Sequence, residues 1–395
     1  MKKFMRKAVA MVCVSAMAMS ALTACGGGSD APADDGEGDA AATTFFVGGI
    51  GPVTGGAAIY GQSVRNGAEM AVEEINAAGG VNGMMFEFDY QDDEHDPEKA
   101  VNAYNTLKDK GMKMLMGTVT SNPCIAVADY TKADNMFQLT PSGSAVAAAP
   151  YDNTFRLCFT DPAQGAASAR YIGENGVATK VAAIYDSSDA YSSGIYESFV
   201  AEAANQGLEI VTAQAFTADS KTDFSVQLQK IQEAAPELVF LPIYYQEAAL
   251  IVKQASTANM EMTFFGCDGL DGIIPQLGDD VALADGVMLL TPFVADAADE
   301  MTQTFVATYQ EKYDMVPTQF AADGYDCMYA LAAAMEQGNV TADMEVSEIC
   351  EIMKVAMTEV TVDGLTGTMT WTADGECDKT PKAMVVKDGA YTAAQ

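Results

Sequence analysis

Apolar and polar residues along most of the chain fall into blocks that predict strands followed by helices. Near-continuous apolar runs, typical of parallel strands buried on both faces, include KVAAIY at 180–185 and ELVFLP at 237–242. Between such runs apolar residues recur at helical spacing, as at Val64, Ala68 and Ala71. This repeated strand–helix–strand order predicts an α/β protein whose mostly parallel sheets are covered by helices on both faces.

Turn and cap residues set the predicted element boundaries. Gly48–Pro52 is predicted to break the first strand, and Asp96 followed by Pro97 predicts a capped helix start. The predicted strands lie near 43–47, 84–90, 112–116, 136–139, 181–185, 208–213, 237–241, 263–266 and 286–290. About 350 residues follow residue 43, which is too many for one core and predicts two lobes.

The first 24 residues are predicted to be a signal peptide. Four basic residues within positions 2–7 precede an apolar run too short for a comfortable membrane span. The run ends in Leu22–Cys25, which resembles a bacterial lipoprotein box and implies cleavage before Cys25 and a lipid on that residue. An ordinary secretory signal with a chance cysteine is the alternative. Residues 25–43 are small and acidic, and we expect a flexible tether.

The chain is strongly acidic, with 55 acidic and 21 basic residues and a net charge of −34. The first 25 residues hold four of the basic residues and no acidic one, so the charge without them is −38. Such a charge repels nucleic acids and anionic lipids, and we expect no nucleic-acid partner. Because no other apolar run approaches ~20 residues, the N-terminal lipid is the only membrane attachment that the sequence predicts.

Six cysteines remain once Cys13 leaves with the signal and Cys25 takes the lipid. They lack metal-like spacing and are predicted to be small buried hydrophobes, with a Cys350–Cys377 disulfide as an open alternative. These six are Cys124, Cys158, Cys267, Cys327, Cys350 and Cys377.

The sequence disfavours an enzyme, a cofactor and a metal site. His95 is the only histidine, so a Ser-His-Asp or Cys-His site would depend on it. It lies in the acidic segment 92–97, which we interpret as a solvated loop before a helix cap rather than as a metal site. The chain carries neither a dinucleotide-binding glycine motif nor a phosphate-binding loop.

Loops that follow strands are the predicted ligand site, because ligands of parallel sheets bind beyond the carboxyl ends of the strands. Two loops, 117–121 and 140–144, are rich in hydroxyl groups and small residues, which suits a carboxylate. Asp268 adds one acid, and Tyr191 and Tyr244 add aromatic walls. Each feature alone also fits a turn or ordinary packing, but together they predict a pocket for a zwitterion.

A series of short motifs carries a family resemblance. They are Gly51-Pro52-x-Thr54-Gly55, Tyr60-Gly61, Asn66–Ala71, Glu74–Val81 with Gly83, Tyr90-x-Asp92-Asp93, Asp96-Pro97, Gly117 with Ser121, and Pro141–Ser144. From about residue 44 onward the chain resembles the Leu/Ile/Val-binding protein family of extracytoplasmic solute receptors. These receptors have the type I periplasmic binding fold and serve ABC importers.

The resemblance implies two α/β lobes that close on a ligand through three hinge crossings, near residues 160, 291 and 372. The N-terminal lobe would comprise 44–160 and 292–371. The C-terminal lobe would comprise 161–291 and 372–395.

The resemblance also implies a role for each residue of the ligand site. Ser121 and Ser144 would hold the ligand carboxylate. The Ser142 carbonyl and the Ser144 hydroxyl would meet the ammonium, which Asp268 would neutralise. The side-chain pocket would be lined by Tyr60, Tyr191, Tyr244 and Phe320.

Two departures from the family weaken the expectation that this chain shares the leucine specificity of the best-known members. Asp268 stands where the best-known members carry glutamate, and its shorter arm leaves more room. His95 and Thr120 occupy the positions of a family disulfide, so the loop that bears Ser121 is predicted to be held by packing instead.

The predicted function is a monomeric, lipid-anchored receptor outside the cell membrane. It would deliver a branched-chain or other apolar amino acid to an ABC transporter permease. The alternative is the same fold with another small polar solute, such as urea, a short amide or an aromatic acid. A urea-type ligand would not need Asp268 opposite an ammonium, so ligand binding to a variant of Asp268 separates the two.

Overall fold

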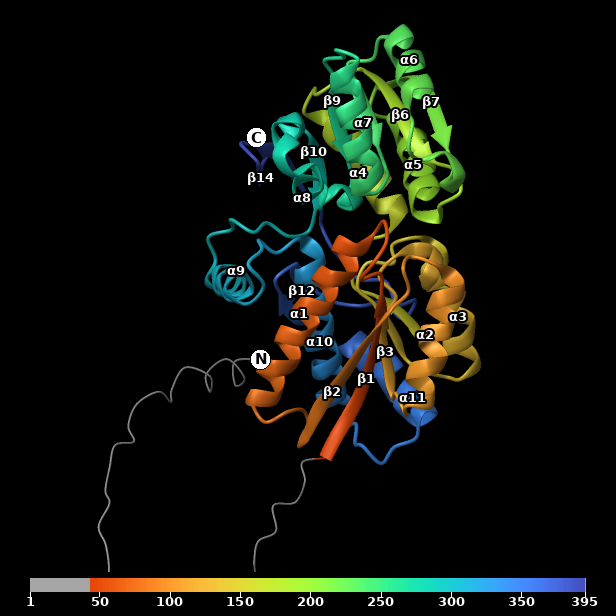
Figure 1. Ribbon diagram of the computed structural model, residues 1–395. Coiled ribbons are helices and arrows are strands. Elements are labelled where there is room, and N and C mark those ends of the chain that lie inside the picture. The colour runs from red at the N-terminus through yellow and green to blue at the C-terminus, as the bar shows by residue number, and fades with distance from the viewer. Residues whose placement is uncertain (1–42, 395) are drawn as a thin grey trace, which may run out of the picture.

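The computed structural model describes residues 43–394, which form two α/β lobes placed end to end (Figure 1). Each lobe is built on one mostly parallel sheet with helices on both faces, so the predicted fold class is confirmed. The predicted signal peptide, Cys25 and the predicted tether up to residue 42 lie outside the described residues.

The sheet of the N-terminal lobe is entirely parallel, with strand order β2-β1-β3-β4-β5. Successive residues of a strand point to opposite faces, so each strand feeds two cores: Met114 packs on one face and Leu115 on the other. The strands are β1 (Thr43–Gly51), β2 (Met84–Asp92), β3 (Met114–Gly117), β4 (Gln138–Thr140) and β5 (Thr154–Arg156).

Two pairs of helices cover this sheet. The helices α1 (Ala58–Ala77) and α10 (Gln319–Gly338) pack on one face, and α2 (Pro97–Asp109) and α3 (Ser121–Ala133) pack on the other. The first pair touches backbone to backbone, since a Cβ added to Gly67 would lie 1.9 Å from the carbonyl oxygen of Ala321. Glycine at this position therefore lets α10, which follows α1 by more than 240 residues, complete the lobe.

The sheet of the C-terminal lobe has strand order β14-β13-β10-β9-β8-β6-β7. It is parallel except for β13, which pairs antiparallel with both β10 and β14. The strands are β6 (Lys180–Asp186), β7 (Glu209–Phe216), β8 (Leu238–Leu241), β9 (Thr263–Gly266), β10 (Met288–Thr291), β13 (Lys382–Lys387) and β14 (Ala390–Ala393).

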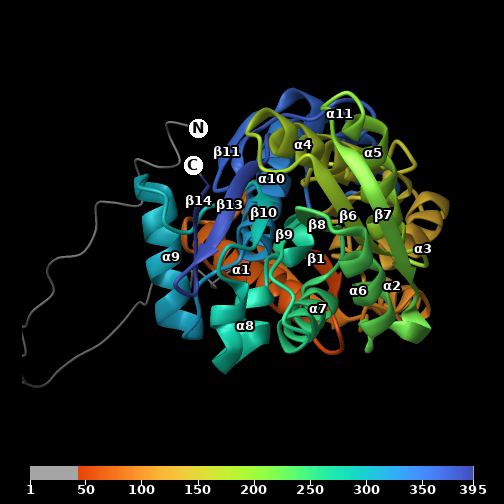
Figure 2. The same ribbon diagram turned by 90° about the horizontal axis from the view of Figure 1, so that it is seen from above.

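Helices cover both faces of this second sheet (Figure 2). On one face lie α4 (Asp161–Glu174) and α5 (Ala190–Ala203), and on the other lie α6 (Ser225–Ala234) and α7 (Tyr245–Thr257). The remaining elements are α8 (Ile273–Leu277), α9 (Glu300–Tyr313), α11 (Val346–Glu359), the hairpin β11 (Val362–Gly364) and β12 (Gly367–Met369), and four 3₁₀ turns, η1 (Val146–Ala148), η2 (Ala218–Ser220), η3 (Asp268–Leu270) and η4 (Gly278–Ala284).

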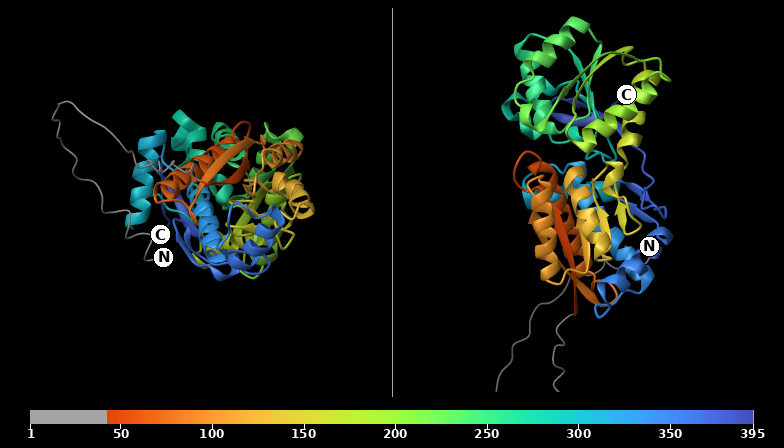
Figure 3. Two further views of the ribbon diagram at one scale, coloured as in Figure 1. Left: turned by 90° about the horizontal axis from the view of Figure 1, so that it is seen from below. Right: turned by 90° about the vertical axis from the view of Figure 1, so that its right-hand side faces the viewer.

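In the described part of the chain, three segments pass between the two sheets (Figure 3). The first follows β5, the second follows β10, and the third runs from β12 to β13. We refer to residues 371–378 of the third segment as the third crossing. The precise residues at which each lobe ends stay a prediction.

The predicted break at Gly48–Pro52 is wrong. The strand β1 continues to Gly51 and pairs with both β2 and β3. The glycines make room for neighbours, since a Cβ on Gly48 would lie 2.1 Å from the sulfur of Met112. Pro52, which has no N–H to donate, stands where the strand ends. Glycine here signals close packing rather than a turn.

The predicted helix start at Asp96 is confirmed. Its carboxylate accepts hydrogen bonds from the backbone N–H groups of Glu98 and Lys99, both at 2.9 Å, and Pro97 is the first helical residue. The six cysteines within residues 43–394 are all free thiols. Five of them are buried, as predicted, and Cys377 is half-buried. The open alternative of a Cys350–Cys377 disulfide is therefore wrong.

Candidate ligand-binding site

Loops from both lobes meet at a small cavity between the two sheets. It is lined by Tyr60, Val119, Thr120, Ser121, Ser142, Tyr191, Tyr244, Asp268, Gly269 and Phe320. Seven of the eight predicted ligand residues are in this set. The eighth, Ser144, is fully buried and is not among the lining residues. The cavity volume of about 10 Å³ is room for roughly one water molecule, so a larger ligand enters only when the lobes separate.

The N-terminal lobe contributes two loops that begin where β3 and β4 end. Ser121 is the first residue of α3, and its hydroxyl accepts a hydrogen bond from the Ala145 N–H at 3.1 Å. Ser142 donates its hydroxyl to the Val119 carbonyl at 2.6 Å. These bonds hold the first loop against the second one, residues 141–146, which we call the serine loop.

Ser144 differs from its two neighbours in that its hydroxyl lies beside the Asp161 carboxylate without a well-aligned hydrogen bond. Among the described residues no hydrogen-bond partner lies in good geometry for its Oγ, although the side chain is 0 % exposed. A buried hydroxyl without a partner costs free energy. Of the three serines, Ser144 thus has the hydroxyl that is least well hydrogen-bonded inside the protein.

His95 holds the loop that bears Ser121. Its Nδ1 shares a hydrogen bond of 2.8 Å with Oγ1 of Thr120, and its ring meets the Tyr244 ring edge to face at 5.3 Å. Burial lowers the pKa of His95 to about 4, so the ring is neutral at pH 7. The predicted solvated loop is thus wrong for this side chain, and the loop is held by a hydrogen bond rather than by packing alone.

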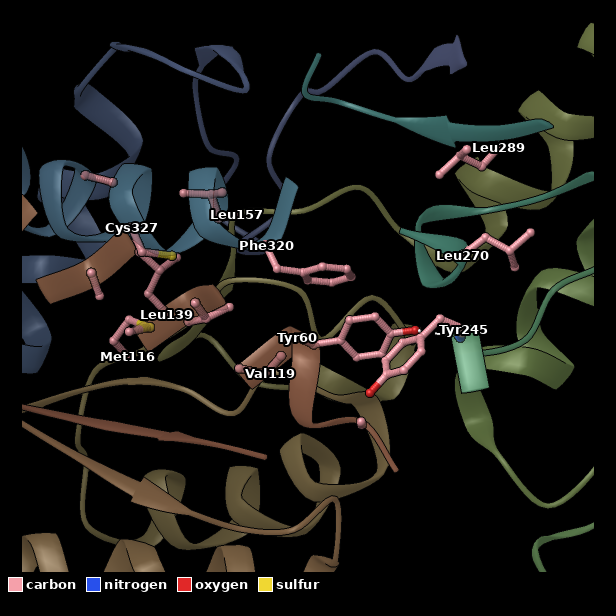
Figure 4. Close-up of a cluster of buried hydrophobic side chains, with 14 of the residues drawn as sticks. Tyr60, Met116, Val119, Leu139, Leu157, Tyr245, Leu270, Leu289, Phe320 and Cys327 are labelled. Carbon is pink, nitrogen blue, oxygen red and sulfur yellow. Dashed lines mark hydrogen bonds between the residues drawn. The ribbon is translucent and has the colours of Figure 1, made fainter. Parts of the chain in front are cut away.

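Aromatic rings from both lobes line the cavity. Figure 4 shows two of them, Tyr60 and Phe320, with Tyr245 beside Tyr60. The rings of Tyr191 and Tyr244 stack at 4.9 Å, and those of Tyr60 and Phe320 lie 4.3 Å apart. The Tyr60 hydroxyl donates to the Gly269 carbonyl and accepts from the Tyr245 N–H at 3.1 Å. Tyr60, in α1 of the N-terminal lobe, is thus hydrogen-bonded to two backbone groups of the C-terminal lobe.

Asp268 is the acid of the cavity and is 3 % exposed. Its Oδ1 accepts a hydrogen bond from the Tyr191 hydroxyl at 2.8 Å. Burial raises the pKa of Asp268 to about 6, against the lowering effect of the bonds from Tyr191 and Gln164. A positive charge placed beside this carboxylate would restore its ionised form.

Two further buried acids near the cavity were missed from the sequence. Asp161 opens α4, is 1 % exposed, and has neither carboxylate oxygen in a good hydrogen bond with the described residues. Burial raises its pKa well above the usual range. Asp189 caps α5 and accepts a hydrogen bond of 3.1 Å from the Asn122 side chain of the other lobe. Asp161 is the first residue of α4 and Asp189 caps α5, and an acid at a helix start gives no separate signal in the sequence.

The described residues contain no cluster of three or more His, Cys, Asp or Glu side chains placed to bind a metal. Across residues 43–394, no helix has both the length and the apolar character of a membrane span.

The sequence profile of the periplasmic binding protein family matches residues 44–390. The chain belongs to this family. The match covers both lobes, and it confirms the family that the motifs of the N-terminal lobe predicted.

Named relatives of this periplasmic binding protein include Leu/Ile/Val-binding proteins. It is 34% identical over 233 residues to Leu/Ile/Val-binding protein homolog 3 of Brucella melitensis, a match that spans 58% of this chain and 63% of the relative. It is 27% identical to the leucine-, isoleucine-, valine-, threonine- and alanine-binding protein of Pseudomonas aeruginosa, over 78% of this chain and 82% of the relative.

Solved structures share the fold. The branched-chain amino acid transporter substrate binding protein LivJ of Streptococcus pneumoniae, in complex with isoleucine, aligns with a TM-score of 0.81 at 26% identity. That alignment covers 89% of this chain and 98% of the other. A solute binding protein of an ABC transporter from R. palustris, in complex with benzoate, aligns with a TM-score of 0.80 at 21% identity, over 89% of this chain and 95% of the other.

Proposed function

We propose that this protein is an extracytoplasmic receptor that binds a branched-chain or other apolar amino acid and delivers it to the permease of an ABC importer. The observation that carries the proposal is Asp268, a buried acid that faces the same cavity as the serines of the other lobe. The names of the relatives, which include Leu/Ile/Val-binding proteins and a transporter protein in complex with isoleucine, support the same class of ligand.

In this proposal the N-terminal lobe binds the carboxylate, and the C-terminal lobe supplies the counter-charge of the ammonium. Ser121, Ser144 and the N-terminus of α3 would hold the carboxylate, and Asp268 with the Ser142 carbonyl would hold the ammonium. Tyr60, Tyr191, Tyr244 and Phe320 would surround the side chain. Each charge-assisted contact contributes roughly 1.5–3 kcal/mol, and desolvation of the two ligand charges offsets part of that gain.

An aromatic acid, urea or a short amide is the second candidate. Four aromatic side chains line the cavity, and the benzoate-bound protein from R. palustris has the same fold. Asp268 weighs against a ligand with a carboxylate alone, because an acid of the ligand would then lie close to a buried acid of the protein.

A thermal-shift screen tests the ligand class. The panel contains the twenty common amino acids, urea, acetamide and benzoate, because a ligand that binds the folded state raises its apparent stability by mass action. We expect the largest shift with leucine, isoleucine or valine. A shift with benzoate or urea and none with any amino acid would contradict the proposal and favour the second candidate.

We further propose that Cys25 carries the lipid that anchors a monomeric receptor to the cell membrane. The lipid is the only attachment that the sequence predicts, so Cys25→Ser would release a folded receptor with unchanged ligand affinity. Fractionation followed by a binding assay checks this. A Cys25→Ser variant that stays tightly bound to membranes in high salt would refute the anchor.

A further inference from the structure

Arg156, at the end of β5, is completely buried, and its side chain points at backbone carbonyl groups. The guanidinium donates to the four consecutive carbonyl oxygens of residues 143–146, at 3.1, 2.8, 3.0 and 3.2 Å. These residues belong to the serine loop. Its Nε lies 3.0 Å from Oε2 of Glu376, which is an ion-pair distance without hydrogen-bond alignment. Glu376, at 36% side-chain exposure, is thus the acid paired with this buried cation.

Arg156 fixes the direction of the donors in the serine loop. In a trans peptide the C=O and N–H groups point in opposite directions, so carbonyls held toward the guanidinium turn the following N–H groups away from it. The Ala145 N–H follows this rule and donates to the Ser121 hydroxyl at 3.1 Å. The Ser144 carbonyl is held in the same way, since it accepts from Arg156 at 2.8 Å and from the Asp161 N–H at 3.0 Å.

The backbone of Arg156 is bonded to the third crossing as well. Its N–H donates to the Gly375 carbonyl at 2.9 Å, and its carbonyl accepts from the Trp371 indole N–H at 2.8 Å. Gly375 has a φ of +77°, and a Cβ there would lie 2.4 Å from the Thr154 carbonyl oxygen. The third crossing is therefore pressed against the end of β5 on either side of Glu376.

We propose that Arg156 and Glu376 form a strut that ties the serine loop to the third crossing and thereby holds the loop in the shape that binds the ligand. Arg156 is a positioning residue, because it touches the loop that would hold the ligand carboxylate and not the cavity itself. The inference rests on the proposed function for the identity of the ligand. The strut does not include the ligand and can be tested in the protein without one.

The test compares Glu376→Gln with Asp378→Asn. Both variants remove one negative charge from the third crossing, but among the described residues Asp378 has no side-chain contact with Arg156. Hydrogen exchange of the backbone amides of residues 143–148 is measured without ligand, and the leucine affinity is measured by titration calorimetry. We expect Glu376→Gln to speed exchange of these amides and to weaken leucine binding about five- to tenfold, in the range of typical coupling between sites. Asp378→Asn should do neither.

A second variant separates positioning from general stability. In a Ser144→Ala background, Glu376→Gln should weaken leucine binding much less than it does in the parent, because both changes act through the same loop. Additive effects, an unchanged affinity of Glu376→Gln, or an equal effect of Asp378→Asn would overturn the strut. If the parent binds no leucine, the proposed function fails instead, and unchanged hydrogen exchange in Glu376→Gln would still overturn the strut.

Discussion

The two lobes meet the cavity with different chemistry. The N-terminal lobe presents serine hydroxyls and the start of α3, which together form a partly positive surface without a charged side chain in the cavity lining described. The C-terminal lobe presents the Asp268 carboxylate and the stacked rings of Tyr191 and Tyr244. Each lobe on its own suits one end of a zwitterion, so a ligand with both charges gains most when the lobes are together.

In both lobes the site residues are held by hydrogen bonds within the lobe, although the bonding groups differ. In the N-terminal lobe, the hydroxyls of Ser121 and Ser142 are used within the lobe to join one loop to the other. In the C-terminal lobe, Asp268 is bonded to Tyr191, whose hydroxyl also accepts from the Gly269 N–H at 2.9 Å. A preorganised site of this kind reduces the ordering cost of binding, because few groups have to be fixed when the ligand arrives.

The largest expected effect comes from removing the charge on the C-terminal side. Asp268→Asn keeps the shape and leaves a bound ammonium without its counter-charge, which costs on the order of 3–5 kcal/mol. We expect leucine affinity, measured by calorimetry, to fall by more than about 100-fold. The exposed Glu237→Gln, in the same lobe and away from the cavity, is the control and should bind normally. An affinity loss below about threefold for Asp268→Asn would show that Asp268 does not face the ammonium.

Alanine variants of Ser144 and Ser142 should separate effects on ligand affinity from effects on the free energy of unfolding. Ser144→Ala removes a hydroxyl without a good partner, so we expect a loss of about 1–3 kcal/mol in binding and little change in the free energy of unfolding. Ser142→Ala breaks its bond to the Val119 carbonyl and should lower the free energy of unfolding by about 1 kcal/mol. Denaturant titration and calorimetry on both variants check this. Equal behaviour of the two would contradict the assigned roles.

Ligand affinity and protein stability should respond to pH in opposite directions. A bound ammonium requires ionised Asp268, so below its pKa of about 6 the affinity should fall about tenfold per pH unit and should be level above it. The folded pKa is raised above the ordinary value of 3.8, so the free folded state binds more protons between these two values. Stability from this group is therefore present at low pH and lost as the pH rises toward 6.

Asp189 and Asp271 act on stability in the same direction, because burial raises the pKa of each to about 7. Calorimetric titrations and thermal melts of the free protein between pH 4 and 8 check both trends. Leucine affinity of Asp268→Asn should be independent of pH near 6. A pH step there in that variant would assign the titration to another group.

The smallest expected effect concerns the hydrogen bond that holds the first serine-bearing loop. His95→Phe keeps a ring against Tyr244 and removes the bond to Thr120, so we expect the free energy of unfolding to fall by about 1 kcal/mol. Thr120→Val is the matched variant, and the double variant should be little worse than either single one. Fully additive losses would show that the two side chains do not act as a pair.

The sequence predicted the strands and loops of the site well, because glycine, proline and capping residues mark where parallel strands end. Ser121, Ser142 and Asp268 all lie directly after such ends and line one cavity. It did not predict the partners of His95 and Arg156. Thr120 lies 25 residues from His95, and Glu376 lies 220 residues from Arg156. The carbonyls that Arg156 holds lie 10–13 residues away, but no local pattern shows that the chain folds back onto it.

The glycines of β1 show a second limit. Gly48, Gly49 and Gly51 look like a break when the segment is taken alone, but neighbouring side chains from β2 and elsewhere in the lobe fill the space above them. Ser144 shows a third, since it is buried outside the cavity lining and its hydroxyl lacks a well-aligned hydrogen bond. Tertiary packing, rather than local sequence, determines the roles of the β1 glycines and of Ser144.

One titration tests most directly the claim that the two lobes divide the charges of the ligand. The unmodified protein is titrated with leucine, with 4-methylpentanoate, which lacks the ammonium, and with 3-methylbutylamine, which lacks the carboxylate. We predict that leucine binds at least about 100-fold more tightly than either analogue, because each analogue leaves one lobe without its charge partner. If 4-methylpentanoate bound as tightly as leucine, Asp268 would have no part in recognition. If 3-methylbutylamine did so, the serines of the N-terminal lobe would have none. Either result would contradict the account.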